Sequence, residues 1–158
     1  MPATTRPPTR AARFAAVLTA VKAAHDVGDF AAQTDHQSAR KPCAADRAEG
    51  VACTEAASWR ALAAHVASYH AVQAAALVTV DRALGLGLSP ARMVAGIALS
   101  AATHAVIDRR WPVRLFMDRT GSTAFRLHGG GAMHVDQAAH HACLAAAALV
   151  MATGPDRR

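Results

Sequence analysis

Apolar residues recur with a helical period in four long stretches of the chain, each bounded by residues that interrupt helices. The first stretch, from about Ala11 to Arg40, is stopped by Pro42, because proline disfavours helical backbone in the residue before it. A second helix is expected from Ser58, a suitable N-cap, to about Leu84, where Gly85-Leu86-Gly87 ends it. The polar residues 42–57 would form the loop between these two helices.

The second half of the chain carries two more helical stretches. Ser89-Pro90 is a favoured helix start, an N-cap followed by proline in the first turn, and that helix should end near Trp111 because Pro112 follows. The fourth helix is expected from about Met133 to Thr153. The pattern therefore predicts an all-α fold that resembles a four-helix bundle.

The least regular stretch, residues 112–131, lies between the third and fourth helices. Val113–Asp118 is expected to form a short turn of helix. The run Gly129-Gly130-Gly131 suggests a hinge, since it lacks the preceding strand and the following Lys-Ser/Thr of a phosphate-binding loop. We predict one helical domain over residues 11–153, with a disordered basic tail at residues 1–10 and a second tail at residues 154–158.

Composition supports helices and adds a positive charge. The chain has 158 residues, is rich in Ala and contains only 4% aromatic residues, and Ala is the best helix former and a poor strand former. The formal net charge is +6. The arginines are scattered over predicted helix ends and loops, where we expect them to be exposed: Arg13, Arg40, Arg60, Arg82, Arg92, Arg109, Arg110 and Arg119. They form no stripe along one helix, so a basic DNA-associated regulator is the least favoured of the alternatives.

The second predicted helix is apolar enough to raise the question of a membrane. Ala61–Val80 is a run of twenty residues without a formal charge, which is long enough to cross a bilayer. The other apolar stretches are shorter, Ala is only marginally apolar on insertion scales, and positive charges occur in both sets of loops. The pattern thus leaves open a soluble Ala-rich bundle in the cytoplasm and a small multipass protein of the cytoplasmic membrane.

Histidine and aspartate recur four residues apart on the inward faces of the predicted helices. His25 and Asp29 share a face with apolar residues one and two turns earlier, and His104 and Asp108 repeat the pair on the third helix. Asp136 and His140 form the reversed pair on the fourth helix, and the second helix contributes His65. Burying such groups is costly unless they are paired or coordinated, so we expect most of them to converge within about 8 Å of a common centre.

Imidazole and carboxylate ligands suit a divalent metal such as zinc, manganese or iron, and helical bundles build such sites from inward-facing pairs. The seven candidate ligands are His25, Asp29, His65, His104, Asp108, Asp136 and His140. Supporting side chains would be Gln33, Tyr69, Thr103 and Gln137. One or two metal ions would activate water to hydrolyse a phosphate or acyl ester, with Asp29 or His140 as base. The alternative from another class is a non-enzymatic membrane or structural protein whose His–Asp hydrogen bonds fix helix packing.

Two of the three cysteines lie in the predicted polar loop. Cys43 and Cys53 are either bridged, if that loop faces an oxidising compartment, or two unpaired thiols. Cys143 lies in an apolar helix, where we expect it to pack in the core.

The ordered motifs resemble those of the bacterial DUF3307 family over roughly residues 14–150. The first is Ala24-His25-x-x-Gly28-Asp29-Phe30-x-x-Gln33-Thr34-Asp35, and His65 follows. Thr103-His104-x-x-Ile107-Asp108 and Asp136-Gln137-x-x-His140 come next in the same order. The resemblance implies a small multipass membrane protein and the positions of its site, but no reaction. By analogy alone, the pattern is also similar to membrane-bound metal-dependent hydrolases.

The chain departs from this family in two ways. The family commonly has Ser before the His of the third helix, where this chain has Thr103. The family's helices are typically rich in Leu and Ile, whereas these are rich in Ala, which weakens the inference of a membrane location.

Overall fold

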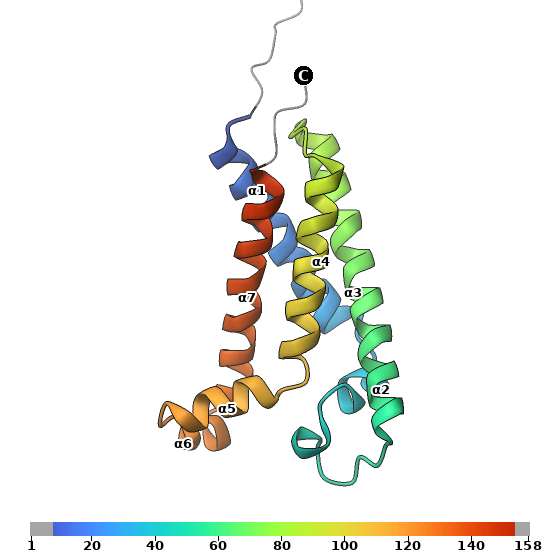
Figure 1. Ribbon diagram of the computed structural model, residues 1–158, viewed down its shortest axis with the longest axis vertical. Helices are drawn as coiled ribbons and strands as arrows, with labels where there is room; N and C mark the ends of the chain where they lie inside the picture. The colour runs from blue at the N-terminus through green and yellow to red at the C-terminus, as the bar shows by residue number, and fades with distance from the viewer. Residues whose placement is uncertain (1–7, 154–158) are drawn as a thin grey trace, which may run out of the picture.

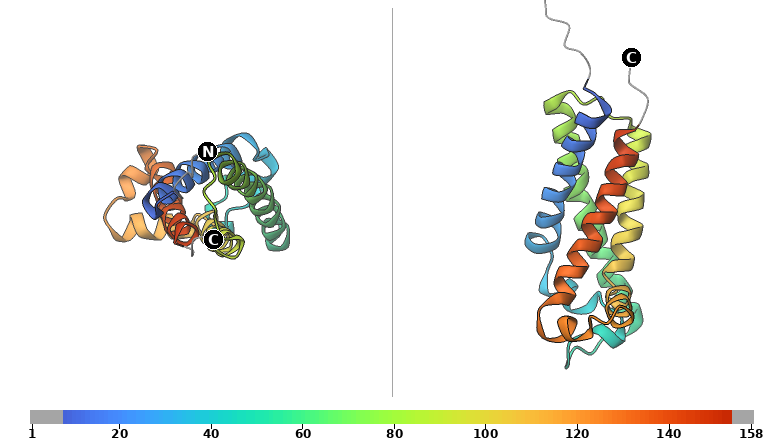
Figure 2. Two further views of the ribbon diagram at one scale, coloured as in Figure 1. Left: turned by 90° about the horizontal axis from the view of Figure 1, so that it is seen from above. Right: turned by 90° about the vertical axis from the view of Figure 1, so that its left-hand side faces the viewer.

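Four long helices run alongside one another and make up most of the structure, a computed structural model that describes residues 8–153 (Figure 1). They are α1 (Arg10–Asp26), α3 (Glu55–Leu84), α4 (Pro90–Ile107) and α7 (Gly131–Ala152). Each contacts two others, in the cyclic order α1, α3, α4, α7, so that the four enclose a common interior (Figure 2). Residues 8–153 contain no strand, which confirms the predicted all-α, bundle-like fold.

The short elements gather at one end of this bundle, the lower end in Figure 1. A single π-helical segment, η1 (Val27–Ala31), follows α1 directly, and α2 (Asp35–Arg40) and the 3₁₀ turn η2 (Ala44–Asp46) come after it. Between α4 and α7 lie α5 (Trp111–Arg119) and α6 (Thr123–His128). The segment expected to be irregular is thus mostly helical, with α5 longer than the predicted turn.

The first predicted helix is broken into three pieces rather than continuous to Arg40. The chain leaves regular α-helix after Asp26, forms η1, and begins again at α2. Thr34 caps α2 with a capping box, in which its hydroxyl accepts from the Gln37 N–H and the Gln37 side chain accepts from the Thr34 N–H. This capping box starts a new helix at Asp35, so α1 does not continue through this region.

The second helix begins earlier than expected, because Thr54 is its N-cap and not Ser58. The Ser58 hydroxyl is buried and donates to the carbonyl oxygens of Arg40 and Pro42, which ties the loop to α3. The predicted end is confirmed: Gly85 adopts the left-handed conformation, with φ of +58°, that terminates α3. Ser89 precedes α4 as expected, but α4 ends at Ile107.

The apolar core fills the half of the bundle away from the short helices. Val17 and Val21 of α1 meet Leu77 of α3 and Leu144 and Met151 of α7 there. A smaller apolar cluster of Ile107, Val113 and Met117 lies under α5. Polar residues therefore occupy the interior mainly at the other end, beside η1, α2 and α5.

Two of the arginines expected on the surface are buried, which corrects that prediction. The Arg13 Nε donates to the Leu86 carbonyl oxygen at 2.7 Å. Arg109 donates to the Lys41 carbonyl oxygen and to the Ser58 hydroxyl, pairs with Glu55, and lies 4.5 Å from the centre of the Trp59 ring. Each guanidinium donates hydrogen bonds to loop carbonyl groups at a helix end. The spacing of residues in the sequence does not reveal that an arginine has such partners.

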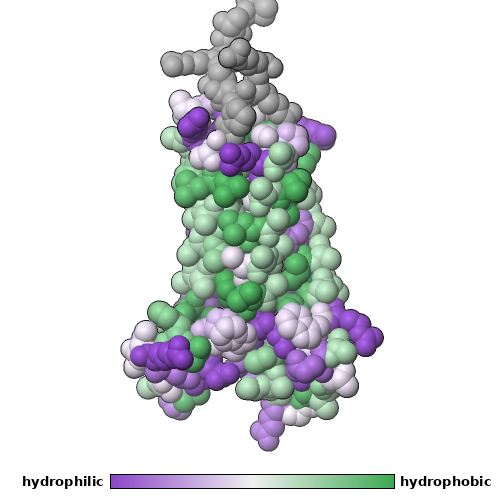
Figure 3. Space-filling model, viewed as in Figure 1, coloured by the Kyte–Doolittle hydropathy of each residue, from purple (hydrophilic) through white to green (hydrophobic). Residues whose placement is uncertain are grey.

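On the face shown in Figure 3, a broad apolar surface covers the middle of the bundle, and polar residues gather toward both ends. The helices α3 and α4 are long and apolar enough to cross a membrane, and only 39% and 22% of their most apolar windows are buried within the structure. Val78, Val94, Leu99 and Val106 are exposed on this surface.

The tails predicted at residues 1–10 and 154–158 fall largely outside the described residues. Thr9 and Arg10 are described, and they are the N-cap and first residue of α1 rather than part of a tail. Cys43, Cys53 and Cys143 are all free thiols.

Candidate metal centre

The π-helical segment η1 aims Asp29 into the bundle. Its wider turn changes the direction of side chains relative to α1, and Asp29 is only 5% exposed. Gly28 allows this turn to lie against α3, since a Cβ at this position would stand 2.6 Å from the Tyr69 ring. The last turn of α1 and the segment η1 thus place His25 and Asp29 at the same interior site.

Four side chains from three parts of the chain converge at the polar end of the interior. The His65 Nε2 lies 3.0 Å from Asp29 Oδ1, 3.0 Å from His104 Nε2 and 3.2 Å from Asp108 Oδ2. The His104 Nε2 lies 3.0 Å from Asp108 Oδ2 and 3.8 Å from Asp29 Oδ1. All four residues are buried. We call this set the four-residue group.

The donor set and its spacing fit a divalent metal. Ligands at the corners of a tetrahedron with metal–ligand bonds of about 2.0–2.1 Å stand about 3.3 Å apart, within the range of these five separations. Hydrogen bonds alone do not account for the cluster: Asp29 Oδ1 and Asp108 Oδ2 are buried without a well-aligned hydrogen-bond partner. The His65 Nε2 faces two carboxylate oxygens and a second imidazole nitrogen, and a single proton cannot serve all three. The four-residue group could therefore hold one metal ion.

A fifth side chain of the cluster, Lys41, was not anticipated from the sequence. Its buried Nζ lies 2.8 Å from Asp108 Oδ1, 3.5 Å from Asp29 Oδ1 and 3.2 Å from His65 Nε2. Lysine just before a proline at a helix end is ordinarily a solvated residue, so the sequence offered no signal for it. Burial opposes ionisation of Asp29, but the hydrogen bond from His65 and the charge of Lys41 outweigh it and hold the pKa of Asp29 below its ordinary value.

Asp108 is ionised for the same reasons. Burial would raise its pKa, but hydrogen bonds from His104 and His65 and the nearby charge of Lys41 keep the pKa well below the ordinary value. Two carboxylates and one ammonium leave a formal charge of −1 in the buried cluster when the imidazoles are in the neutral form that binds a metal. A divalent cation would be attracted to such a site.

His25 converges on the same centre but has both ring nitrogens occupied. Its Nδ1 lies 3.0 Å from the Tyr69 hydroxyl and its Nε2 lies 2.7 Å from Gln137 Oε1. The Nε2 is 3.8 Å from Asp29 Oδ2, and His25, Asp29 and His140 form a second group that could hold an ion. Binding there would require the Gln137 contact to open, so the four-residue group is the better-prepared of the two.

His140 and Asp136 form a separate pair at the edge of the cluster. The His140 Nδ1 lies 3.0 Å from the Asp136 carbonyl oxygen and 3.3 Å from Asp136 Oδ2. The Nε2 is buried without a hydrogen-bond partner and lies 4.0 Å from Asp108 Oδ1. Asp136 thus lies behind His140 rather than among the potential ligands, an arrangement in which a carboxylate orients an imidazole.

The expected supporting residues divide into those that reach the cluster and one that does not. Tyr69 and Gln137 contact His25, and the Gln33 side chain donates to the Asp29 carbonyl oxygen at 2.9 Å. The Thr103 hydroxyl instead donates to the Leu99 carbonyl oxygen one turn back in α4, so the prediction for Thr103 is wrong. Its position beside His104 in the sequence places it on a different face of the helix.

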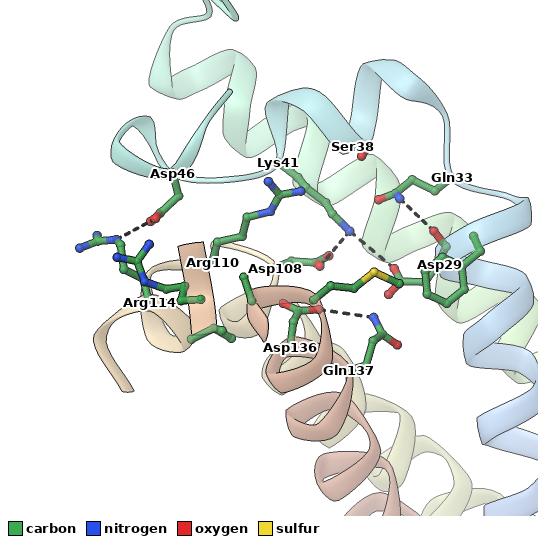
Figure 4. A pocket seen from close by; sticks show the side chains of 15 residues that line it. Asp29, Gln33, Ser38, Lys41, Asp46, Asp108, Arg110, Arg114, Asp136 and Gln137 are labelled. Atoms are coloured by element: carbon green, nitrogen blue, oxygen red, sulfur yellow. Dashed lines mark hydrogen bonds and ion pairs between the residues drawn. The ribbon is translucent and has the colours of Figure 1, made fainter. Parts of the chain in front are cut away.

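A cleft of about 540 Å³ opens beside the cluster (Figure 4). Asp29, Lys41 and Asp108 line its inner wall, and the dashed ion pairs of Lys41 with both carboxylates mark the point where the cleft meets the four-residue group. Arg110 and Arg114 of the α5 region also line the cleft, and in this view Arg110 extends toward Lys41 and Arg114 toward Asp46. A small molecule in this cleft would contact Asp29, Lys41 and Asp108, whereas His65 and His104 lie behind them and do not line it.

Comparison with models of protein families, with curated proteins and with solved structures gives no match for this chain. The function is therefore inferred from the geometry of the site itself.

Proposed function

We propose that the protein is a membrane-embedded, metal-dependent hydrolase whose centre is the four-residue group of Asp29, His65, His104 and Asp108. The observation that carries this proposal is the convergence of two imidazole nitrogens and two carboxylates at the separations of metal ligands, with carboxylate oxygens left without aligned hydrogen bonds. The ordered motifs that resemble the DUF3307 family are consistent with it. Zinc, manganese and iron suit the donor set.

The residues around the group have distinct tasks in this proposal. A bound divalent ion would supply a water of lowered pKa and polarise an ester oxygen. His140 accepts the proton of the attacking water at Nε2, because Asp136 holds its other nitrogen. Both Asp29 and His140 were candidates for the base, and the geometry favours His140, since Asp29 Oδ1 faces the two imidazoles. Lys41, paired with Asp108 Oδ1, lies where it can stabilise negative charge on the substrate.

A membrane location is supported by the exposed apolar surface and by the aromatic residues at its lower rim. Trp59 and Trp111 are 56% and 44% exposed near the polar end that holds the cluster. Tryptophan is favoured at the boundary between lipid and water. We therefore place the cleft near this boundary, with α3 and α4 crossing the bilayer. The buried Arg13 and Arg109 serve the fold, which leaves fewer arginines for a surface that would bind DNA.

A second candidate function follows from Lys41. Its ammonium pairs with both carboxylates, so the cluster is also able to act as a buried ion-pair network that fixes the packing of the helices. In that case the protein would bind no metal.

The two functions are separated by metal content. We expect the full chain, purified in detergent without chelators and supplied in turn with zinc, manganese and iron, to retain close to one ion. Asp108→Asn and Asp29→Asn should each lower metal affinity by about 10–100-fold, because each removes a charged oxygen from the group. Asp81→Asn, far from the cluster at the end of α3, is the control. Absence of metal under all three conditions would contradict the proposed function and favour the ion-pair network.

A further inference from the structure

The cleft beside the metal centre has four cationic side chains in its lining, Lys41, Arg110, Arg114 and Arg126. Four carboxylates, those of Asp29, Asp46, Asp108 and Asp136, line it as well, so the divalent ion of the proposed function would give the lining its net positive charge. The Arg114 Nε is held by Asp46 at 2.7 Å and Arg126 is held by Asp118 at 3.0 Å, which fixes where these guanidinium groups lie. Fixed guanidinium groups recognise phosphate well because their planar donors match its oxygens.

Arg110 is the guanidinium best prepared for an incoming ligand. Its side chain has no hydrogen bond or ion pair with any residue in the described range 8–153, and it extends into the cleft (Figure 4). Its backbone has φ of +63°, the only left-handed non-glycine residue among those described. This conformation favours glycine, so the fold tolerates strain here while keeping an arginine.

An apolar groove of about 380 Å³ adjoins the charged cleft. Its walls include Ile107, Pro112, Phe116 and Val135, and Val113 belongs to both the groove and the cleft. Phe116 is 58% exposed, so the groove opens outward. It lies where the short helix α5 meets α7, at the polar end of the exposed apolar surface. A molecule that spans both spaces would have an anionic end and a hydrocarbon end.

We infer that the substrate is an amphiphilic phosphate ester, a lipid whose phosphate binds in the charged cleft and whose hydrocarbon chain lies in the groove beside Val113. This inference rests on the proposed function and adds its substrate class. The phosphate would contact Arg110 and Lys41, which brings its ester bond to the wall formed by Asp29 and Asp108. The balanced reaction is hydrolysis: water adds to phosphorus, the phosphorus–oxygen ester bond breaks, and the leaving alcohol takes up a proton.

Binding of short-chain lipids to the full chain in detergent tests this inference by calorimetry. The probes are dihexanoyl phosphatidic acid, dihexanoylglycerol, which lacks the phosphate, and inorganic phosphate, which lacks the chains. We expect phosphatidic acid to bind at least tenfold more tightly than either of the other two. Equal affinity for phosphatidic acid and inorganic phosphate would overturn the role of the groove, and equal affinity for phosphatidic acid and dihexanoylglycerol would overturn the role of the cleft.

Two variants test the two halves of the site. Arg110→Gly should weaken phosphatidic acid binding by tenfold or more while the thermal midpoint stays level or rises, since glycine suits the left-handed backbone. Ala138→Trp should fill the groove from its exposed side and abolish the preference for phosphatidic acid over inorganic phosphate. The matched controls are Arg119→Ala on α5 and Ala142→Trp one turn further along α7, neither of which lines either space. Unchanged binding in both test variants would overturn the inference.

Measuring the metal content of the same samples separates a failure of the lipid inference from a failure of the proposed function. Metal bound at one ion per chain without a preference for phosphatidic acid overturns only the substrate class. A preference for phosphatidic acid in a protein that takes up no metal upholds the lipid site and overturns the hydrolase.

Discussion

The charge of Lys41, a residue that the sequence did not point to, bears on both the stability of the fold and the binding of metal. Its ammonium lies among two carboxylates and an imidazole nitrogen, in the space beside the proposed ion. A positive charge there stabilises the metal-free fold, because it offsets the two buried carboxylates, and it also disfavours a second positive charge nearby. In the proposed function, Lys41 would therefore lower the affinity for metal while stabilising the metal-free protein.

Replacement of Lys41 by methionine should uncouple these two effects. Without metal, Lys41→Met should lower the free energy of unfolding by about 3–5 kcal/mol, the usual cost of breaking a buried ion pair. Added zinc should restore the thermal midpoint, and zinc should bind more tightly than to the wild type. Lys22→Met, at an exposed position of α1, is the control. A loss of stability that zinc does not restore would argue against an ion at this site.

The pair of His140 and Asp136 gives a second prediction at this scale. Asp136→Asn should leave metal content unchanged but reduce turnover of a phosphate ester by about 100-fold, because it removes the carboxylate charge that stabilises the protonated His140 imidazole, although the Asp136 carbonyl oxygen still accepts from Nδ1. Parallel measurements of bound metal and of the rate constant for hydrolysis check this. If Asp136→Asn lost its metal, Asp136 would be a ligand, as the sequence first suggested.

At the residue scale, the spacing of His and Asp predicted the convergence correctly. His25, Asp29 and His104 are buried as expected, since each lies on the apolar stripe of its helix. His70 is five residues from His65 and so does not share its helix face, yet it too is buried and lies within hydrogen-bond distance of the Ser100 hydroxyl. The helix α3 has neighbours on more than one side and therefore buries more than one face. The spacing of apolar residues within α3 does not reveal which further faces are buried.

At the scale of elements, the sequence predicted the long helices but not the break after α1. The i,i+4 spacing of His25 and Asp29 looks the same in an α-helix and across the start of η1. A continuous α-helix and the start of η1 differ in a contact between residues distant in sequence: Gly28 packs against the Tyr69 ring of α3. The shape of this segment is therefore a property of two elements together.

Gly28→Ala tests this contact. The new methyl group would meet the Tyr69 ring at 2.6 Å, and that ring is itself packed against His104, with 4.0 Å between ring centres. We expect a loss of about 1–3 kcal/mol in the free energy of unfolding, typical of overpacking. Metal affinity should fall as well, because η1 carries Asp29. Ala32→Ser, at an exposed position just after η1, should change neither quantity, and an equal loss in both variants would contradict the role of Gly28.

The whole molecule has polar ends and an apolar middle, and this distribution has a consequence for its topology. The described chain begins with α1 and ends with α7 at the end opposite the short helices (Figure 1). The loop with Cys43 and Cys53 lies at the other end, beside the metal centre. If the bundle crosses a bilayer, these two ends lie on opposite sides of it.

Cysteine labelling checks this arrangement. In intact membrane vesicles, an impermeant maleimide should modify Cys53 from one side only. In a variant with all native cysteines replaced, Arg82→Cys, at the far end of α3, should be modified from the other side only. The protein should also stay in the membrane fraction after washing with high salt and require detergent for extraction. Release by salt, or labelling of both positions from the same side, would contradict a membrane-spanning bundle.

The position of the cleft at the rim of the apolar surface determines how the protein would encounter its ligand. A lipid substrate would arrive by lateral diffusion within the leaflet, without passing through water. The rate of hydrolysis would then follow the mole fraction of that lipid in the surface rather than its amount per volume of solution. Dilution of the substrate lipid with inert lipid should slow turnover, whereas dilution of the whole vesicle suspension with buffer should leave turnover per protein unchanged.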